Sequence, residues 1–246
     1  MLIENISVVI MAKNAQETIV ECLDSLVDFQ EIVLYLNDST DNTKNIAEKY
    51  NNIKIVHGEF IGFGPTKNTA ATYASNDWIL SLDSDEILNE ELINEILSQD
   101  FDNKNNLFTM IRDNYFLGEK TISKDHIVRL YNREKNLFDD ALVHEKVQIH
   151  EYNNHITLKT TFKHLNITDI NQILTKMIKY TDLGAEGKKT CFFGVVIAKA
   201  FFAFFQTYIL KFYFINGWVG FTKAVSNANR RFYKYLKQYI NCKNIS

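Results

Sequence analysis

The run Trp78-Ile-Leu-Ser-Leu-Asp83-Ser-Asp85-Glu86 carries the strongest local signal in the sequence. Its apolar first half predicts a buried strand over residues 77–82, and its second half places two carboxylates two residues apart with a third beside them. Carboxylate oxygens suit hard divalent cations such as Mg²⁺ or Mn²⁺, which in turn bind diphosphate oxygens. The alternative interpretation is a solvated acidic turn that caps the following helix.

Short apolar strands alternate with helical patterns on both sides of this run. Strands are expected at residues 3–11, 31–36 and 53–57, and helices at residues 15–27, 41–50, 65–74 and 89–98. This alternation predicts a mainly parallel sheet covered on both faces, in which ligands bind outside the carboxyl ends of the strands. Polar clusters stand at three such ends, and we expect them to converge on one crevice: Lys13-Asn14, Asn37-Asp38-Ser39 and Asp83-Ser84-Asp85-Glu86.

The remaining sequence predicts an extension of this sheet and a helical tail. Strand-like runs at residues 107–112, 126–131 and 156–164 indicate antiparallel strands that would complete a second wall of the site. A helix is expected at residues 169–188, followed by an almost wholly apolar run at residues 191–210. We therefore predict an α/β catalytic domain over residues 1–168 and a helical extension over residues 169–246.

Charge is distributed unevenly along the chain. Of the 27 Lys and Arg residues, ten lie in residues 188–246, where there is no Asp or Glu, so residues 1–187 hold 17 bases against all 30 acids. An acidic body argues against nucleic acid as the main partner, because phosphate contacts require a basic surface around the site. Aromatic residues interspersed with Lys and Arg are typical of helices that lie in a membrane interface.

Two alternatives to an interfacial tail remain open. The tail could be a soluble helical pair that packs its aromatic residues on the protein. It could also be a true membrane span, although Lys199 stands within the apolar run and a central Lys costs about 2.5–3.5 kcal/mol on insertion scales.

The cysteines and the N-terminus bear on the cellular compartment. Cys22, Cys191 and Cys242 are odd in number, widely separated and without metal-site spacing, which predicts reduced thiols in the cytosol. Residues 1–11 lack the layout of a signal peptide. We therefore expect a cytoplasmic protein that is peripheral on the inner face of the cytoplasmic membrane.

Six short motifs follow one another along nearly the whole chain. They are Lys13-Asn14 after the first strand, Ser39-Thr40-Asp41, Gly62-Phe63-Gly64-Pro65-Thr66-Lys67-Asn68, Asp83-Ser84-Asp85-Glu86, Arg129-Leu130 and Leu142-Val143-His144-Glu145. In this order they resemble the family 2 inverting glycosyltransferases, in particular the lipopolysaccharide-core β-glucosyltransferase-like branch. The segment Asn216-Gly217-Trp218-Val-Gly220 also looks like the closing segment of that family. The resemblance implies a GT-A-like α/β/α sandwich.

The resemblance implies roles for individual residues around the donor. Asn14, Asn37 and Lys67 would lie along the nucleotide, with Lys67 near the base or the diphosphate. Asp83 would face the ribose or metal-bound water, and Asp85 would ligate the metal directly. The metal would neutralise charge on the departing nucleoside diphosphate.

The resemblance also assigns the catalytic base. Inverting transfer needs one carboxylate to deprotonate the acceptor hydroxyl as that oxygen attacks the anomeric carbon, and Glu145 matches the position of this base. Its alternative is a strand-end carboxylate in a salt bridge. His164 could ligate the metal or contact the diphosphate, or it could be a structural histidine, and the same choice applies to His144.

Two departures from the family pattern bear on the nucleotide preference. Leu36 precedes Asn37-Asp38 where the family usually has Asp before the Ser-Thr-Asp turn, and Ala15 stands where Glu usually follows Lys-Asn. Both changes remove an acidic group near the pocket that is predicted to bind the base of the nucleotide.

We therefore expect an enzyme that transfers a hexose from a UDP-sugar to a lipid-anchored saccharide such as the lipopolysaccharide or lipooligosaccharide core. Glucose is the leading candidate for the hexose. One alternative is a polyprenyl-phosphate glycosyltransferase, and another is a catalytically inactive sugar-nucleotide-binding protein. The presence of Asp83, Asp85 and Glu145 argues against the second, because binding alone does not require a base. No Gly-x-Gly-x-x-Gly follows the first strand, which disfavours a nicotinamide-dependent enzyme.

Overall fold

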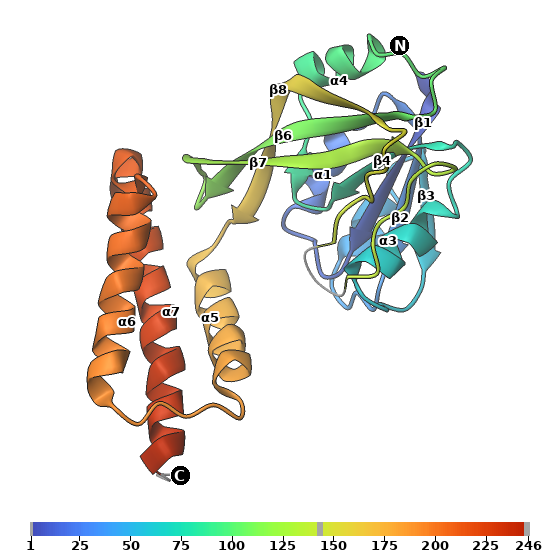
Figure 1. Ribbon diagram of the computed structural model, residues 1–246. Helices are drawn as coiled ribbons and strands as arrows, with labels where there is room; N and C mark the ends of the chain where they lie inside the picture. Colours follow the sequence, from blue (N-terminus) through green and yellow to red (C-terminus); the bar gives the residue numbers. More distant parts are fainter. Residues whose placement is uncertain (1, 142–144, 244–246) are drawn as a thin grey trace. The chain divides into compact units, whose positions relative to one another are not determined.

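The computed structural model describes residues 2–141 and 145–243 (Figure 1). The chain divides into two compact units. The first comprises Met1–Asp113 and Lys124–His164, and the second comprises Asn114–Ser123 and Leu165–Ser246.

A parallel sheet forms the centre of the first unit. It contains β1 (Ile3–Ala12), β2 (Phe29–Leu36), β3 (Ile53–His57) and β4 (Trp78–Asp83), with β1 between β2 and β4. Each of these neighbours is parallel to the next, so their carboxyl ends lie at the same edge. At that edge β1 pairs through Met11 with Asp83 and through Ala12 with Leu36. The predicted parallel sheet is therefore confirmed.

Helices cover both faces of this sheet because successive strand side chains point in opposite directions. On β1, Val8 and Ile10 belong to a core cluster that includes residues of α1, α2 and α4, whereas Val9 belongs to a second cluster with residues of α3. The predicted α/β/α sandwich is thus confirmed. The helices are α1 (Ile19–Asp24), α2 (Thr43–Ala47), α3 (Phe63–Ala71) and α4 (Glu90–Leu97).

Antiparallel strands extend the sheet beyond β4. The full order is β3-β2-β1-β4-β7-β6-β8-β5, and both β4–β7 and β5–β8 are antiparallel pairs. The two-residue strand β5 places Glu86 opposite His164 of β8. Two residues are too few for a periodic pattern, so the sequence did not reveal β5. The added strands are β5 (Glu86–Ile87), β6 (Asn106–Phe116), β7 (Glu119–Asn132) and β8 (Asn154–Ile167).

The second unit is mainly helical, and α7 packs along both α5 and α6 (Figure 1). Its elements are α5 (Ile170–Ala185), α6 (Phe193–Phe205), the π-helical η1 (Gln206–Leu210), the 3₁₀ η2 (Tyr213–Asn216) and α7 (Gly217–Lys243). The start of α7 passes close to η2: a Cβ on Gly220 would lie 1.7 Å from the carbonyl oxygen of Tyr213. A side chain at position 220 would therefore separate the two elements.

One expectation about the cysteines was wrong. Cys191 and Cys242 form a disulfide with their Cα atoms 5.4 Å apart, although they are 51 positions apart in sequence. Antiparallel packing of α6 and α7 brings these two ends together, and spacing along the chain could not show this. Cys22 is a free, buried thiol. The thiol argument for a cytosolic location therefore no longer holds.

One helical stretch of the described chain, Phe193–Leu210, passes a test of length and apolar composition for membrane crossing, with a mean hydropathy of 1.7. Only 17% of this stretch is buried in the protein.

Candidate active site

The loops that follow β1 and β2 are clamped together at the carboxyl edge of the sheet. Asn14 and Asp38 both adopt positive φ, at 51° and 55°, a conformation that Asn and Asp tolerate better than most residues. The backbone N–H of Thr40 donates to Asn14 Oδ1 at 2.8 Å, and the Asn14 N–H donates to Ser39 Oγ at 3.0 Å. The Ser-Thr-Asp turn therefore fixes the loop that carries Asn14.

Asn37 is the first residue after β2 and is only 5% exposed. Its backbone N–H donates to the carbonyl of Ala12, but its side-chain Oδ1 has no hydrogen-bond partner among the described residues. Buried polar atoms nearly always have a partner, so this oxygen is a candidate acceptor for a donor group on a ligand.

The Gly-Phe-Gly-Pro-Thr-Lys-Asn run forms the start of α3 and contacts the segment at Phe138 and Asp139. A Cβ on Gly64 would lie 1.9 Å from the carbonyl oxygen of Asp139, so only glycine allows this approach. Asn68 exchanges two hydrogen bonds of 2.9 Å with the backbone of Phe138. The helix and the backbone at Phe138 and Asp139 are thereby held against each other.

Lys67 brings two predicted site carboxylates together. Its Nζ lies 2.9 Å from Asp83 Oδ1 and 2.8 Å from Glu145 Oε1, and the Lys67 side chain is only 2% exposed. This buried cation bridges the end of β4 and the predicted base. A role for Lys67 beside the nucleotide stays a prediction.

A second cationic side chain, from β7, also contacts Asp83. Arg129 Nη2 donates to Asp83 Oδ2, while about a third of the Asp83 side-chain surface remains exposed. Desolvation by itself would raise the pKa of Asp83, but Arg129 and Lys67 outweigh it and hold that pKa well below its usual range. Because the folded pKa is depressed, the stabilisation is present above the unfolded pKa of about 3.9 and is lost as pH falls through the lower folded value.

Glu86, the third acid of the run, lies in the interior. It is 0% exposed, accepts hydrogen bonds from Arg112 and Arg129, and accepts the backbone N–H of Asp83 at 3.0 Å. Arg112 also binds Asp125. Glu86 therefore ties the turn after β4 to β6 and β7.

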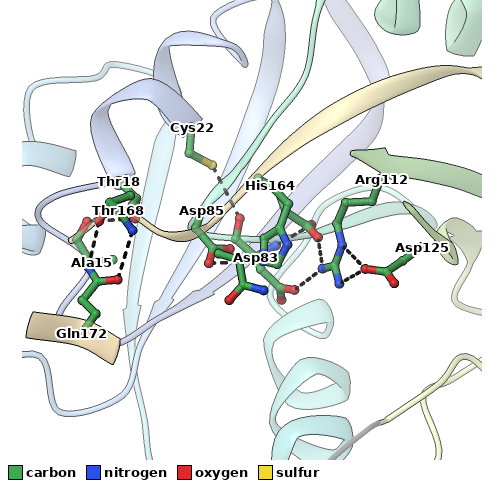
Figure 2. A network of polar contacts seen from close by, with 12 residues as sticks. Ala15, Thr18, Cys22, Asp83, Asp85, Arg112, Asp125, His164, Thr168 and Gln172 are labelled. Atoms are coloured by element: carbon green, nitrogen blue, oxygen red, sulfur yellow. Dashed lines mark hydrogen bonds and ion pairs between the residues drawn. The ribbon is translucent and has the colours of Figure 1, made fainter. Parts of the chain in front are cut away.

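Asp85 points to a different neighbour. Its Oδ2 lies 3.5 Å from Nε2 of His164, and 31% of the Asp85 side-chain surface is exposed (Figure 2). The pairing of β5 with β8 sets this contact, because it places the residue next to Asp85 opposite His164. Within residues 2–141 and 145–243, no group of three or more His, Cys, Asp or Glu side chains is arranged to hold a metal ion.

The Asp85–His164 pair nevertheless fits a divalent cation whose remaining ligands come from a substrate and from water. Mg²⁺ is commonly held by one or two carboxylates with substrate phosphates and waters, and Mn²⁺ accepts oxygen and imidazole ligands. Asp83 is less suited to direct ligation, because Lys67 and Arg129 already compensate its charge.

The structure thus separates the predicted residues into groups. The β1 and β2 loops carry Asn14 and Asn37, one ion-pair network contains Lys67, Asp83 and Glu145, and Asp85 faces His164. His144, which the sequence also singled out, lies outside the described residues. Arg112 received no role from sequence, Arg129 was noted only as part of a motif, and Glu86 was noted only as the third acid of the Asp83–Glu86 run.

Comparison with known proteins places this geometry in a family. The model for glycosyl transferase family 2 matches residues 7–164. An uncharacterized glycosyltransferase of Rickettsia bellii is 27% identical over 96% of this chain and 87% of its own. The lipopolysaccharide core biosynthesis glycosyltransferase LpsC of Rhizobium meliloti is 25% identical, covering 95% of this chain and 92% of its own.

A solved structure supports the fold. The crystal structure of GalNAc-T7 with UDP, GalNAc and Mn²⁺ aligns with a TM-score of 0.51 at 13% identity, covering 66% of this chain and 44% of the other. The expected GT-A fold is confirmed. Because the family model spans more than half of the residues, the chain belongs to glycosyl transferase family 2 and is a glycosyltransferase.

Proposed function

We propose that the enzyme transfers a hexose from a UDP-sugar to a lipid-anchored saccharide with inversion of the anomeric centre. Glucose is the leading candidate for the hexose. The observation that carries this proposal is the position of Glu145. Its carboxylate is 14% exposed and is held by buried Lys67 at the carboxyl edge of the sheet, where ligands of such sheets bind.

Glu145 acts in this proposal as the base. Within the described residues its ion pair involves only Oε1, so Oε2 is the atom that takes the proton from the acceptor hydroxyl. The acceptor oxygen forms the new bond to the anomeric carbon while the bond to the UDP oxygen breaks, and UDP leaves. The Lys67 bridge fixes the Glu145 carboxylate relative to Asp83, which makes the attack geometry reproducible.

The donor half of the proposal uses the β1 and β2 loops and the end of β4. Asn14 and Asn37 line the nucleotide, and the unpartnered Oδ1 of Asn37 is an acceptor for a base or ribose donor group. Asp83 faces the ribose. The GalNAc-T7 structure contains UDP, and we extend that donor nucleotide to this chain as part of the proposal.

Asp85 and His164 would hold Mg²⁺ or Mn²⁺. The cation would supply compensation for the charge that develops on the departing diphosphate. The backbone of β5 keeps Asp85 facing His164, so the pair is positioned by the sheet itself.

The proposed acceptor rests on the similarity of this chain to LpsC. LpsC is described as a lipopolysaccharide core biosynthesis glycosyltransferase, and this chain covers 92% of its length. We therefore propose a lipopolysaccharide or lipooligosaccharide core as the acceptor. Transfer to a polyprenyl phosphate uses the same donor half and is the alternative that an acceptor assay would separate.

A donor screen tests the nucleotide-sugar proposal. In the presence of Mn²⁺ we expect UDP-glucose to raise the melting temperature of the full chain more than GDP- or CMP-sugars do, because a ligand that binds only the folded state stabilises it. Preference for another nucleotide in this thermal-shift measurement would contradict the UDP assignment.

We also propose that the segment 169–246 binds the inner face of the cytoplasmic membrane. Many of its aromatic side chains are exposed, among them Phe192, Phe201, Phe212 and Trp218. The ten basic residues without acids at positions 188–246 add attraction to anionic lipid of about 1 kcal/mol for each side chain near the surface. This combination supports interfacial binding.

Flotation with vesicles tests the membrane proposal. We expect the full chain to float with anionic liposomes at low salt, to be partly released at high salt, and to be extracted by carbonate. Zwitterionic liposomes are the control. A chain that remains in the soluble fraction with anionic liposomes at low salt would contradict membrane binding by this segment.

A further inference from the structure

The second unit contains two adjoining hollows that share Lys223 and Asn227 of α7. The first has a volume of about 330 Å³ and is lined by α5, α7 and the ends of β6 and β8. The second has a volume of about 420 Å³ and is lined by β7, η1, η2, α7 and Lys211. Both volumes lie in the range of about 300–1,000 Å³ that is usual for small-molecule sites.

Every charged side chain that lines these hollows is basic. Lys176, Lys223 and Arg230 line the first, and Lys211 and Lys223 line the second. None of the four forms an ion pair with a carboxylate within the described part of the chain. The second unit does contain such a pair, between Lys237 and Asp182, but neither residue lines a hollow. The walls therefore carry uncompensated positive charge.

Neutral partners hold three of these cations in place. Lys176 Nζ donates to the carbonyl oxygen of Asn166 at 3.3 Å. Lys223 Nζ donates to the hydroxyl of Tyr213 at 2.8 Å and lies 4.5 Å from the centre of that ring and 5.6 Å from the ring of Phe116. Arg230 Nη2 donates to Asn227 Oδ1 at 2.7 Å. Desolvation and the adjacent Arg231 lower the pKa of Arg230, so a bound anion would relieve an unfavourable environment.

The first hollow also has an apolar wall, made by Phe116, Ile167, Ile173 and Met177. Phe116 and Ile167 belong to a buried hydrophobic cluster. On the same helix as Ile173, exposed apolar residues recur every four positions and form a stripe along α5: Ile170, Leu174 and Ile178. A ligand in this hollow would meet both cationic side chains and hydrocarbon.

We propose that this basic hollow binds a phosphate-bearing amphiphile, with the phosphate among Lys176, Lys223 and Arg230 and the hydrocarbon against the apolar wall. The role of the site rests on the proposed function, in which the acceptor is carried on a lipid; binding itself does not require the donor. Two sources share this chemistry, a phospholipid of the bilayer and a phosphorylated lipid that carries the acceptor. In both cases the site anchors the lipid part and not the reacting hydroxyl.

The test measures binding of three soluble probes to the full chain without any nucleotide sugar: dioctanoyl phosphatidic acid, geranyl phosphate and inorganic phosphate. Arg230→Gln and Lys176→Gln each remove one charge from an exposed side chain of the hollow, so the fold should persist. Lys189→Gln is the matched control, because Lys189 is also exposed, lies in the basic tail and does not line either hollow.

Calorimetry should show that at least one amphiphile binds and that both hollow variants weaken it about fivefold, while Lys189→Gln changes the affinity less than twofold. Tighter binding of geranyl phosphate identifies the source as a prenyl phosphate carrier and favours the alternative acceptor, a polyprenyl phosphate. Tighter binding of phosphatidic acid identifies the source as a lipid with acyl chains, as in the bilayer.

Three results would overturn the proposal. If Lys189→Gln weakens amphiphile binding as much as the hollow variants do, the binding reflects the overall positive charge of the tail and not this hollow. If inorganic phosphate binds as tightly as the amphiphiles, the apolar wall does not contribute to binding. If neither amphiphile binds while UDP-glucose still raises the melting temperature, the hollow proposal fails and the glycosyltransferase proposal stands.

Discussion

Replacing Glu145 by Gln should lower the rate of sugar transfer by roughly 10²–10⁴, the usual contribution of a positioned general base. The amide keeps the size of the side chain and removes its ability to accept a proton. UDP-sugar affinity should change little, because Glu145 contacts Lys67 and is assigned to the acceptor side. Steady-state kinetics with a separate measurement of donor binding distinguish the two effects.

A matched control accompanies this variant. Glu151→Gln makes the same chemical change at an exposed position and should leave transfer unchanged. The melting temperature of Glu145→Gln must also be measured, because the change weakens one of the two carboxylate contacts of Lys67. A folded Glu145→Gln variant with a transfer rate within a few-fold of wild type would assign the base to another group, with Asp139 or Asp140 the next candidates.

Replacing Asp85 by Ala should abolish metal-dependent transfer while the fold persists. The Asp85 carboxylate is partly exposed and faces His164, so its removal breaks no contact with Lys or Arg among the described residues. Stability should therefore change by no more than about 0.5 kcal/mol, as at ordinary surface positions. The measurement is transfer after EDTA treatment and titration with Mn²⁺ or Mg²⁺, in wild type and in the variant.

The control for this variant is Asp28→Ala, which removes an exposed carboxylate outside the site. Wild type and Asp28→Ala should lose activity in EDTA and regain it with either cation, whereas Asp85→Ala should not regain it. Full activity of Asp85→Ala in the presence of chelator would exclude Asp85 as a metal ligand.

Local patterns predicted the framework of the first unit because each element has its own periodicity. The strand at residues 53–57 was predicted at its observed bounds, and the apolar run before Asp83 forms β4 as expected. Helix bounds were less accurate: a helix was expected over residues 15–27, whereas α1 spans Ile19–Asp24. Residues before α1 instead form a loop tied to the Ser-Thr-Asp turn, through contacts that sequence periodicity does not encode.

Features that depend on distant contacts could not be predicted. The ion pairs of Lys67 join residues 16 and 78 positions away, and the contact between Asp85 and His164 joins residues 79 positions apart. Glu86 looked like a third metal-site acid, but antiparallel pairing buries it against two arginines. The disulfide likewise depends on the packing of α6 against α7.

The most direct measurement of the central claim is the anomeric configuration of the product. UDP-glucose carries its sugar in the α configuration, so transfer with Glu145 as the base in a single displacement must give a β-linked product. The experiment incubates the full chain with UDP-glucose, Mn²⁺ and a core-truncated lipopolysaccharide acceptor, and reads the coupling of the anomeric proton by NMR. We expect UDP release together with a β-linked glucose on the acceptor. An α-linked product would contradict inverting transfer by this site.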